Sequence, residues 1–549
     1  MAYLLFPGRH LINTKFQKDY IEKLINIPTG QMDLVGKHEM VDNEKITEII
    51  FAVTSANQSN SRYNPVPFWV RAVAIDRFAS KVKEKTATPY RIIAIPHYPP
   101  SERYIDFILK EIHENTYDHL TLNPQNTLVL CSTPKLVDDY VKKGFGVLTA
   151  EYDYYAKERK QNTPVEIIKI FAESDEGFGE IEEMISEETL SMWRDFPEIP
   201  ETIRRIWRDP LLNESGSLTE ERNYSTYAQG MGHTELINLK YQDIKEALVP
   251  GKIVDEGCAD GSLIVLLARD FPDSDIIGIE ITSEFMARCI ERQRAGEFGG
   301  TFVHFHQKNL LDSIFEDNSI DTTICNSTTH EIWSYGSQKE SLYKYFEKKF
   351  RQMRSGGRLI IRDVVGPENK DKEVYLWLNN EDGENEDIFE NFGSANELET
   401  HIKKLSTEAR FKRFANDYLN DMRIQGKRSK DTQVRFREEK ADEKNFFVTT
   451  LRNSAEFLSK KDYADNWQSE MNEEFTFFDF KEWKGFLKNL GFRIIENPNQ
   501  PSHSSRVYTN QWIVDNRYKD KVKIFEKTDG KLVEIGYPPT NVVLIAEKP

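Results

Sequence analysis

A glycine-rich turn at residues 253–262, reading IVDEGCADGS, combines residue types that could bind a cofactor. An apolar strand pattern runs into Gly257 and Gly261, and the apolar helix pattern SLIVLLARDF follows. Glycines let the backbone turn tightly and approach a ligand closely, and a helix N-terminus offers free N–H groups. The next strand pattern ends in Glu280, 19 residues after Gly261, close to the ~20-residue spacing of a ribose-binding acid in dinucleotide folds. The turn therefore predicts a nucleotide-like cofactor.

Polar side chains follow the next two strand patterns along the chain. Asn309, in KNLLD, comes after the third pattern and could hydrogen-bond a base or ribose edge. NSTTHEIWSYG, after the fourth pattern, carries Ser327, His330 and Glu331. Because the carboxyl ends of parallel strands face the ligand crevice, we expect these side chains beside the reacting group. An imidazole titrates near neutral pH, so His330 is a candidate general base with Glu331 beside it; the alternative is a helix cap or a core-edge residue.

The order of these motifs resembles that of class I S-adenosylmethionine-dependent methyltransferases. The segments that carry the resemblance are DEGCADGS, GIEIT, QKNLLDSIFEDNSIDTTICNS and MRSGGRLIIRD, within about 250–366, and it resumes with FKEWKGFLKNLGFRII (480–495) and NVVLIAEK. The resemblance implies a seven-stranded sheet whose last strand is antiparallel. It implies S-adenosylmethionine as cofactor, bound by Asp255, Gly257 and Gly261 at the turn, Glu280 at the ribose hydroxyls and Asn309 at the adenine edge, with Leu310 and Ser327 completing the set.

Two positions depart from the family pattern. Ala259 stands where the family often has glycine, and Asn309 stands where aspartate is commoner. A methyl group at 259 narrows the turn but leaves the flanking glycines in place. A nicotinamide-binding dehydrogenase would need GxGxxG, which this turn lacks, and an α/β sheet without a ligand is the remaining alternative.

Candidates for the acceptor side of the reaction lie in two segments. Arg362 and Asp363 come at the end of the fifth strand pattern. Tyr224 and Tyr227, in NYSTYAQG just before this domain, could line the cofactor or substrate mouth, with ordinary packing as an equal alternative. Methyl transfer to a well-placed nucleophile needs mainly alignment and desolvation, so a base is not obligatory.

A second resemblance covers the N-terminal part of the chain, about 3–173. FPGRHLINTKFQKDYIEKL, VTSANQSNSRYNPVPFWVRAVAIDRF, NTLVLCSTPKLVDDYVKKGF and TPVEIIKIF follow one another as in archaeal-type nicotinamide mononucleotide adenylyltransferases, of the HxGH nucleotidyltransferase superfamily. Gly8 and Arg9 match the opening motif, but Thr14 and Gln17 stand where its two histidines belong. Because Thr and Gln carry no positive charge, the resemblance implies that nucleotidyl transfer is lost or altered.

The same resemblance implies a nucleotide pocket, for ATP or a nicotinamide nucleotide with magnesium. Its residues would be Gly8, Arg9, Thr14, Gln17, Ser55, Asn57, Trp69 and Ser132. Ile168 replaces a late arginine of the family, which removes one more positive charge. The alternatives are a nucleotidyltransferase with altered donors and a degenerate domain that binds a nucleotide or the partner domain.

The elements that must position these residues form two alternating series of strand and helix patterns, typical of α/β proteins. We predict two doubly wound Rossmann-like sheets, the second a seven-stranded methyltransferase sheet with a large helical insertion. The predicted domains are 1–173 (nucleotidyltransferase-like), 174–222 (helical connector) and 223–549 (methyltransferase), with the insertion at about 367–475. Helical apolar spacing persists in this polar insertion, as in LETHIKKL, and a disordered loop is the alternative.

Composition narrows the functional classes. The formal net charge of −17 and the pI of about 5.3 disfavour a protein whose main task is to grip duplex nucleic acid. Four cysteines without a CxxC pair fit reduced thiols in a cytoplasm and supply no metal framework. No apolar run approaches the ~20 residues of a membrane helix, and the N-terminus shows no export signal. We therefore expect a cytoplasmic protein without a membrane partner.

The combined patterns favour a methyltransferase with a small-molecule or nucleotide acceptor held under the insertion. One alternative is an RNA-modifying enzyme that uses the basic stretch 410–440, where positive charges interleave with Phe and Tyr. Others are a bifunctional adenylyltransferase and methyltransferase, and a noncatalytic sensor of S-adenosylmethionine or a nucleotide. The sequence leaves the oligomeric state open.

Overall fold

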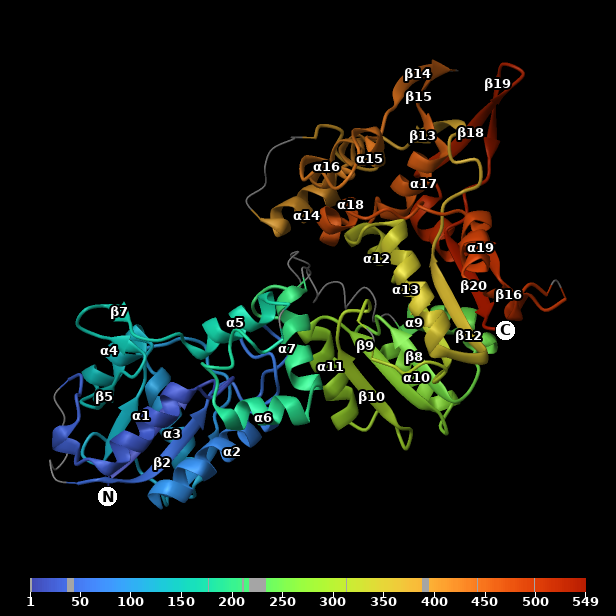
Figure 1. Cartoon of the computed structure of the whole chain (residues 1–549). Coiled ribbons are helices and arrows are strands. Elements are labelled where there is room, and N and C mark those ends of the chain that lie inside the picture. Colours follow the sequence, from blue (N-terminus) through green and yellow to red (C-terminus); the bar gives the residue numbers. More distant parts are fainter. Residues whose placement is uncertain are drawn as a thin grey trace. The chain divides into compact units, whose positions relative to one another are not determined.

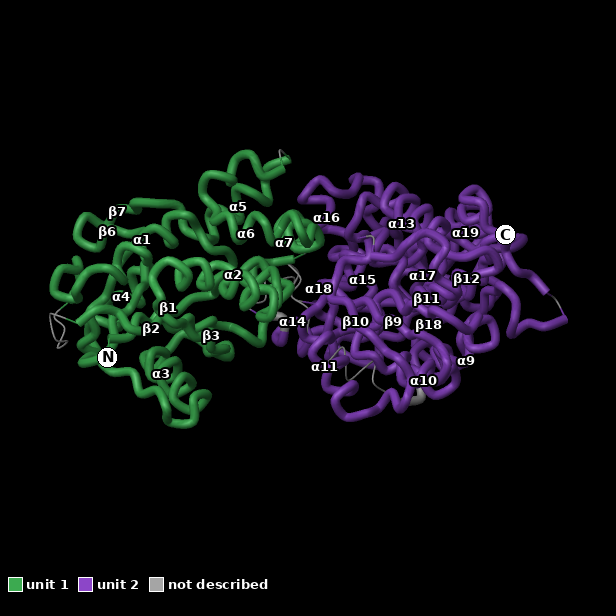
Figure 2. The backbone as a smooth tube through the Cα atoms, turned by 60° about the horizontal axis from the view of Figure 1, so that its bottom comes forward, with its two compact units in different colours: residues 1–219 green, residues 220–549 purple. Residues whose placement is uncertain are grey.

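The chain divides into two compact units, Met1–Thr219 and Glu220–Pro549 (Figure 2). Each unit contains a sheet that is wholly or mainly parallel. The computed structural model describes residues 2–36, 44–175, 177–209, 212–216, 234–312, 314–387, 394–441, 443–497 and 499–549. Over these residues, no helix is both long and apolar enough to cross a membrane.

Five parallel strands form the sheet of the first unit, in the order β3-β2-β1-β4-β5. Their bounds are Ala2–Gly8 (β1), Ile46–Val53 (β2), Tyr90–Ala94 (β3), Thr127–Leu130 (β4) and Gly146–Leu148 (β5). The order reverses between β1 and β4, which makes that pair the topological switch point of the sheet.

Helices cover both faces of this sheet. The helices are α1 (Lys15–Asn26), α2 (Phe68–Thr86), α3 (Tyr104–Asn115) and α4 (Pro134–Lys142). Successive residues of a strand point to opposite faces, so Leu4 and Phe6 of β1 pack with α1 and α2, whereas Leu5 packs with α3 and α4. Three further helices, α5 (Pro164–Glu173), α6 (Glu187–Asp195) and α7 (Glu198–Arg208), share a third core with Leu11 and Ile12.

The sheet of the second unit has the strand order β10-β9-β8-β11-β12-β20-β16, and β17 also pairs with β20. The strands are β8 (Lys252–Glu256), β9 (Asp275–Glu280), β10 (Val303–Gln307), β11 (Ile320–Asn326), β12 (Met353–Val364), β16 (Arg493–Ile494), β17 (Arg506–Tyr508) and β20 (Asn541–Glu547). β20 is antiparallel to β12, as the sequence predicted for the last strand. The predicted α/β class with two doubly wound sheets is confirmed, and β17 is an eighth strand beyond the seven expected.

Two layers of helices enclose this second sheet. One core joins α9 (Thr234–Ile244) and α10 (Ser262–Asp270) to Ile253 and Ile276, and α11 (Ser283–Arg294) reaches it through Cys289. The other joins α13 (Lys339–Gln352) and α19 (Phe480–Asn489) to the neighbouring strand residue Val254. The alternation of Ile253 and Val254 between the two cores is why these strands read as continuous apolar runs.

The large insertion after β12 is built differently from the expectation of a mostly helical segment. It holds α14 (Ala395–Lys404), α15 (Thr407–Asp417), α16 (Asn420–Ile424), α17 (Leu451–Lys460) and α18 (Trp467–Met471). It also holds a five-stranded antiparallel sheet, β14-β15-β13-β18-β19, from β13 (Glu373–Leu378), β14 (Arg437–Ala441), β15 (Lys444–Thr450), β18 (Val522–Thr528) and β19 (Lys531–Ile535).

This insertion sheet corrects both the composition and the bounds that the sequence suggested. β18 and β19 come from a segment far beyond 475, and Figure 1 shows these red strands beside the orange β13 and β15. The edge strand β14 reads REEKA, and charges on an edge strand block further pairing while hiding the period-two pattern of a strand. The charge-rich stretch therefore looked helical or irregular from sequence alone.

Candidate functional site

The glycine turn after β8 has the left-handed backbone that its residue types suggested. Gly257, Ala259 and Gly261 have φ values of +79°, +46° and +78°. A Cβ atom on Gly257 would lie 2.8 Å from the Oγ1 atom of Thr328, so that position has no room for a side chain. Ala259 adopts a conformation that glycine reaches without strain, which is the local cost of its departure from the family pattern.

Glu280, at the end of β9, holds this turn in place. Its Oε2 atom accepts the backbone N–H of Ala259 at 3.0 Å, and its Oε1 atom accepts those of Ile281 and Thr282, both at 2.8 Å. Burial raises the pKa of Glu280, while the bonds from Thr282 and Ile281 act in the opposite direction. The Thr282 side chain also hydrogen-bonds this carboxylate, so Glu280 is held firmly at the turn.

Asp255, at the end of β8, is a buried acid with spare acceptor capacity. Within the described part of the chain, its Oδ2 atom has no hydrogen-bond partner. Burial, together with Glu256 and Glu280, raises the pKa of Asp255 to about 7, and Lys240 of α9 opposes this shift. Burial in turn lowers the pKa of Lys240 to about 8, against the attraction of Asp363 and Asp255. Sequence reasoning missed Lys240, because a single lysine in an amphipathic helix gives no signal.

The remaining cofactor candidates follow the adjacent strands along the same sheet edge. Asn309, after β10, accepts the N–H of Leu311 at 3.0 Å through its side-chain oxygen, and Leu310 beside it is half-buried. Ser327, after β11, has a φ of +58° and donates its N–H to the carbonyl of Arg362 at 2.7 Å. Because β10, β9, β8 and β11 are adjacent and parallel, the structure brings these predicted residues to one edge.

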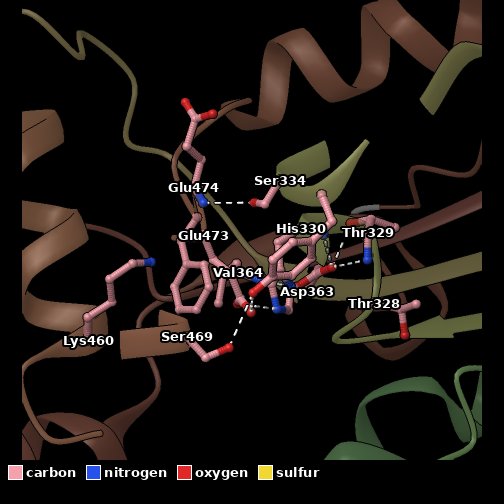
Figure 3. Close-up of polar contacts among 12 residues, drawn as sticks. Thr328, Thr329, His330, Ser334, Asp363, Val364, Lys460, Ser469, Glu473 and Glu474 are labelled. Carbon is pink, nitrogen blue, oxygen red and sulfur yellow. Dashed lines mark hydrogen bonds and ion pairs between the residues drawn. The ribbon is translucent and has the colours of Figure 1, made fainter. Parts of the chain in front are cut away.

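His330 is the second residue of the helix α12 (Thr329–Tyr335) and lies between two carboxylates (Figure 3). Its Nδ1 atom is 2.7 Å from Oδ1 of Asp363, and its Nε2 atom is 3.5 Å from Oε2 of Glu473 in the insertion. The edge of the Phe475 ring packs against the imidazole, with ring centroids 4.8 Å apart. Burial disfavours the charged imidazole, but Asp363 and Glu473 outweigh it and raise the pKa of His330 to about 9.

Asp363 is fully buried and saturated with donors. Its Oδ2 atom accepts the N–H of Thr329 at 2.8 Å, the hydroxyl of Thr329 at 2.5 Å and the N–H of His330 at 3.3 Å. Its Oδ1 atom accepts the N–H of Val364 at 2.8 Å as well as the histidine. Despite burial, His330 and Thr329 lower the pKa of Asp363. The carboxylate thus fixes the first turn of α12, on which Glu331 is half-buried.

Arg362 is also committed to contacts within the protein. Its Nε atom is 2.9 Å from Asp243 of α9, and an Nη atom donates to the Tyr508 hydroxyl of β17 at 3.3 Å. Arg506 pairs with the same Asp243 at 3.0 Å. This cluster joins α9, β12 and β17 behind the site. The other two acceptor-side candidates, Tyr224 and Tyr227, lie outside the described residues.

The segment 473–476 of the insertion docks directly on α12. Glu474 accepts the indole N–H of Trp333 at 3.0 Å. Its own backbone N–H donates to Ser334 at 2.9 Å (Figure 3). The buried Glu456 of α17 accepts the backbone N–H groups of Phe475 and Thr476 at 2.9 and 2.7 Å. Glu473 and Glu474 are functional candidates that sequence reasoning missed, because their partners on α12 are some 140 positions away.

The first unit has a cavity of about 180 Å³ at the carboxyl ends of β1 and β4. Four predicted pocket residues line it: Gly8, Arg9, Gln17 and Ser132. The predicted Thr14 is instead the N-cap of α1, where it forms a capping box with Gln17. The buried acid Glu151 also lines the cavity and accepts the Gln17 amide N–H at 2.8 Å.

The other predicted pocket residues are not part of the cavity lining. Ser55 and Asn57 both contact His97, through its Nδ1 atom at 3.0 Å and its backbone N–H at 2.7 Å. Trp69 is 64% exposed at the start of α2. His10 lines the cavity, and burial lowers its pKa to about 4 while its ring contacts the carbonyl of Phe6 at 3.0 Å.

Comparison with known proteins places a family match on the second unit. Residues 250–437 match the family model described as a methyltransferase domain. No curated protein matches the chain. Similar solved structures include an S-adenosylmethionine-dependent methyltransferase from Methanosarcina mazei, at 16% identity and a TM-score of 0.27, over 56% of this chain and 96% of that one.

Two other solved structures are similarly distant. An S-adenosylmethionine-dependent methyltransferase from Clostridium acetobutylicum is 12% identical with a TM-score of 0.28, over 59% of this chain and 98% of that one. Geranyl diphosphate C-methyltransferase from Streptomyces coelicolor is 11% identical with a TM-score of 0.29, over 62% of this chain and 89% of that one. Similarities at this level do not bear on the acceptor. The family match, together with the strand order and the glycine turn, shows that the second unit carries a methyltransferase domain.

Proposed function

We propose that the second unit transfers a methyl group from S-adenosylmethionine to a small-molecule or nucleotide acceptor that the insertion covers. The observation that carries this proposal is the convergence at one sheet edge of the glycine turn, Glu280 and the His330–Asp363 pair, with Glu473 of the insertion against it. A strand edge of this kind is where open α/β sheets bind ligands.

The residues present fit this cofactor. Its sulfonium and ammonium groups are cationic, and the edge presents the acids Asp255 and Glu280, of which Asp255 has an unpartnered oxygen among the described residues. The Glu280 carboxylate suits a ribose hydroxyl, and a glycine turn lets the backbone approach a ligand closely. When bound, the cofactor supplies an electrophilic methyl group.

The geometry at His330 favours a positioning role over general base catalysis. Both ring nitrogens face carboxylates, and with a pKa of about 9 the imidazole keeps both protons at neutral pH. An imidazolium donates hydrogen bonds and cannot accept the proton of an acceptor O–H or N–H. His330 would therefore align α12 and the insertion over the acceptor, while exclusion of water and alignment supply the rate enhancement.

Part of the basic stretch 410–440 is unavailable for the RNA-modifying alternative. Arg413 pairs with Asp417 at 2.5 Å, and Arg428 pairs with Glu474 at 2.7 Å. Both arginines are buried, and Phe411 and Phe414 of the same stretch lie in the insertion core. Charges that are neutralised inside the protein cannot neutralise phosphates, and buried rings cannot stack on bases.

For the first unit, we propose a small-molecule pocket without adenylyl transfer. Thr14 and Gln17, at the positions of the family's histidines, are used to cap α1. Of the nearby basic residues, Lys15 pairs with Glu183 at 3.1 Å, and His10 is neutral with its pKa near 4. Among the described lining residues Arg9 keeps a positive charge, but the two histidines that would act with it are missing, which disfavours the bifunctional alternative.

Calorimetric titration with S-adenosylmethionine tests the cofactor site. Gly257→Ala should abolish binding, because its Cβ atom meets Thr328. Gly296→Ala is the matched control: Gly296 has a similar φ of +75° but open space around a Cβ atom, so binding should be retained. Equal binding by both variants would show that the cofactor lies elsewhere.

The acceptor class can be tested with methyl-labelled S-adenosylmethionine and a cell extract. We expect enzyme-dependent label in the small-molecule fraction, and none with Gly257→Ala. Label that appears in the RNA fraction instead would establish the RNA-modifying alternative. Cofactor binding without label in any fraction would establish the sensor alternative.

A further inference from the structure

The cavity of the first unit lies at the switch point of its sheet. The chain leaving β1, residues Gly8 to Ile12, forms one wall, and Cys131 to Thr133, leaving β4, form the opposite wall. β1 and β4 are adjacent, and the connections that follow them run to opposite faces. Open α/β sheets bind ligands in the crevice that this arrangement creates.

The most informative group in this cavity is the carboxylate of Glu151. The residue is only 7% exposed. Its oxygens accept the amide N–H of Gln17 at 2.8 Å and the hydroxyl of Ser132, whose oxygen accepts the Glu151 backbone N–H at 3.0 Å. Neither neighbour is charged, and over the described residues Glu151 forms no ion pair. A buried charge of this kind is costly unless a counter-ion is present.

The basic residues around the cavity do not supply that counter-ion. Arg9 donates to the carbonyl of Tyr63 at 2.9 Å and lies over the Tyr63 ring, 5.3 Å from its centroid. Lys15 is paired with Glu183, and His10 is uncharged at neutral pH. The polar side chains that line the remaining wall are the hydroxyls of Ser132, Thr133 and Thr163.

We propose that this cavity binds a small organic amine, whose ammonium group pairs with Glu151. The volume of about 180 Å³ is below the ~300–1,000 Å³ of pockets for drug-sized ligands, so the amine is small. The wall hydroxyls accept its other N–H or O–H groups. This inference concerns the first unit alone and does not depend on the methyltransferase site.

Cys131 lines the same cavity and reports its electrostatic potential in the full-length protein. It is the only cysteine of the first unit, and peptide mapping separates it from Cys258, Cys289 and Cys325. We would compare its modification by a cationic reagent, trimethylammonioethyl methanethiosulfonate, and an anionic one, sulfonatoethyl methanethiosulfonate. Burial raises the pKa of this thiol to about 11, but the thiolate fraction cancels in the ratio of the two rates.

The cationic reagent should react about tenfold faster or more, after correction for the reagents' rates with a free thiol, because Glu151 attracts it and repels the anion. Glu151→Gln should bring the corrected ratio to one or below, since the amide keeps the shape but not the charge while Arg9 of the lining stays positive. Glu158→Gln, an exposed acid outside the cavity, should leave the ratio unchanged. A wild-type ratio near one, or no reaction with either reagent, would overturn the proposal.

Protection of Cys131 gives a second readout that needs only the wild-type protein. Putrescine or agmatine at millimolar concentration should slow modification by an uncharged reagent, iodoacetamide, whereas ATP and nicotinamide mononucleotide should not. Protection by the nucleotides but not by the amines would overturn the assignment in favour of a nucleotide pocket. Lack of protection by either amine would also overturn it.

Discussion

At the scale of single residues, His330 shows how one side chain joins elements that are distant in sequence. Its Nδ1 atom contacts the carboxylate of Asp363 at the end of β12, and its Nε2 atom faces the carboxylate of Glu473 in the insertion. The sequence placed it correctly at a sheet edge but suggested a base. The second carboxylate, Glu473, favours a positioning role in our proposal, because two adjacent acids stabilise the charged form of a histidine.

The titration of His330 should appear in the pH dependence of stability. Its pKa is about 9 in the folded protein and 6.5 ordinarily, so its contribution is complete below about 6.5 and is lost as pH rises through 9. Relative to His330→Gln, the wild-type free energy of unfolding should fall by roughly 3 kcal/mol between pH 6 and 10. Chemical denaturation across this range measures the difference, which also cancels the titration of Asp255 and Lys240. A constant difference would mean that His330 is not held as a cation.

Glu280 should bind the cofactor and hold the turn at the same time. Three backbone N–H groups converge on its two oxygens, so Glu280→Gln places an amide N–H₂ against at least one donor. We expect S-adenosylmethionine affinity to fall by about 1–3 kcal/mol in calorimetry. Glu284→Gln, an exposed acid on α11, serves as the control. Unchanged affinity in Glu280→Gln would remove this residue from the cofactor site.

At the scale of elements, α12 is the part of the second unit on which the insertion rests. Trp333 and Ser334 contact Glu474, Tyr335 donates to Glu473 at 2.9 Å, and Asp363 fixes the helix from below. α12 is short and is contacted on both sides. A shift of the insertion would therefore move α12 relative to the sheet edge that carries the predicted cofactor residues. Deleting 370–470 would remove β13 and leave β18 without one of its two neighbours, so a point substitution separates the roles more clearly.

Glu473→Gln should loosen this junction without disturbing the cofactor edge. Amide hydrogen exchange should become faster in α12 and in 473–476, because the charge that helps hold His330 is lost, while exchange in β8 and β9 stays the same. Glu399→Gln, on α14 and away from α12, should leave both regions unchanged. If exchange in α12 does not respond, Glu473 is not part of the junction.

The sheet edge with the predicted cofactor residues could be located from sequence, because each of these residues lies directly at or after the strand that positions it. Each strand there is a short apolar run that ends in a polar residue, as at Asp255, Glu280 and Asn309, and parallel pairing brings those ends together. The insertion sheet could not, because its charged edge strand hides alternation and β13 pairs with a strand from the far end of the chain. Lys240 and Glu473 were missed for the same reason: tertiary packing alone gives them their environment.

At the scale of the whole molecule, two units with the same layered architecture use their switch points differently. In the second, a left-handed glycine turn follows the strand, and its N–H groups are held by the carbonyl of Ile279 and by Glu280. In the first, the N-terminus of α1 is covered by the chain: the backbone N–H of Lys15 donates to the carbonyl of Met184 at 3.1 Å, and that of Ser186 donates to the carbonyl of Asn13 at 2.9 Å. A covered helix N-terminus cannot offer its N–H groups to a phosphate.

We therefore expect no adenylyl transfer by the full-length protein. Incubation with ATP, magnesium and nicotinamide mononucleotide should give no dinucleotide above background, because Thr14 and Gln17 cap α1 and carry no charge. Loss of one oxyanion-type donor typically costs ~10²–10³ in rate. Chromatographic measurement of the dinucleotide decides the matter, and turnover near ~1 s⁻¹ would show a working second enzyme.

The insertion sheet has a consequence for folding of the protein during its synthesis on the ribosome. Strands β8 to β11 are complete early, whereas β13 gains its neighbour β18 only when residues 522–528 have been synthesised. Until then one edge of β13 is open to pairing with other chains, which is a known route to aggregation. Premature stop codons late in the message would therefore yield chains that contain β8 to β11 but lack β18. The edge of β13 would stay unpaired in such chains, and we expect quality-control proteases to remove them.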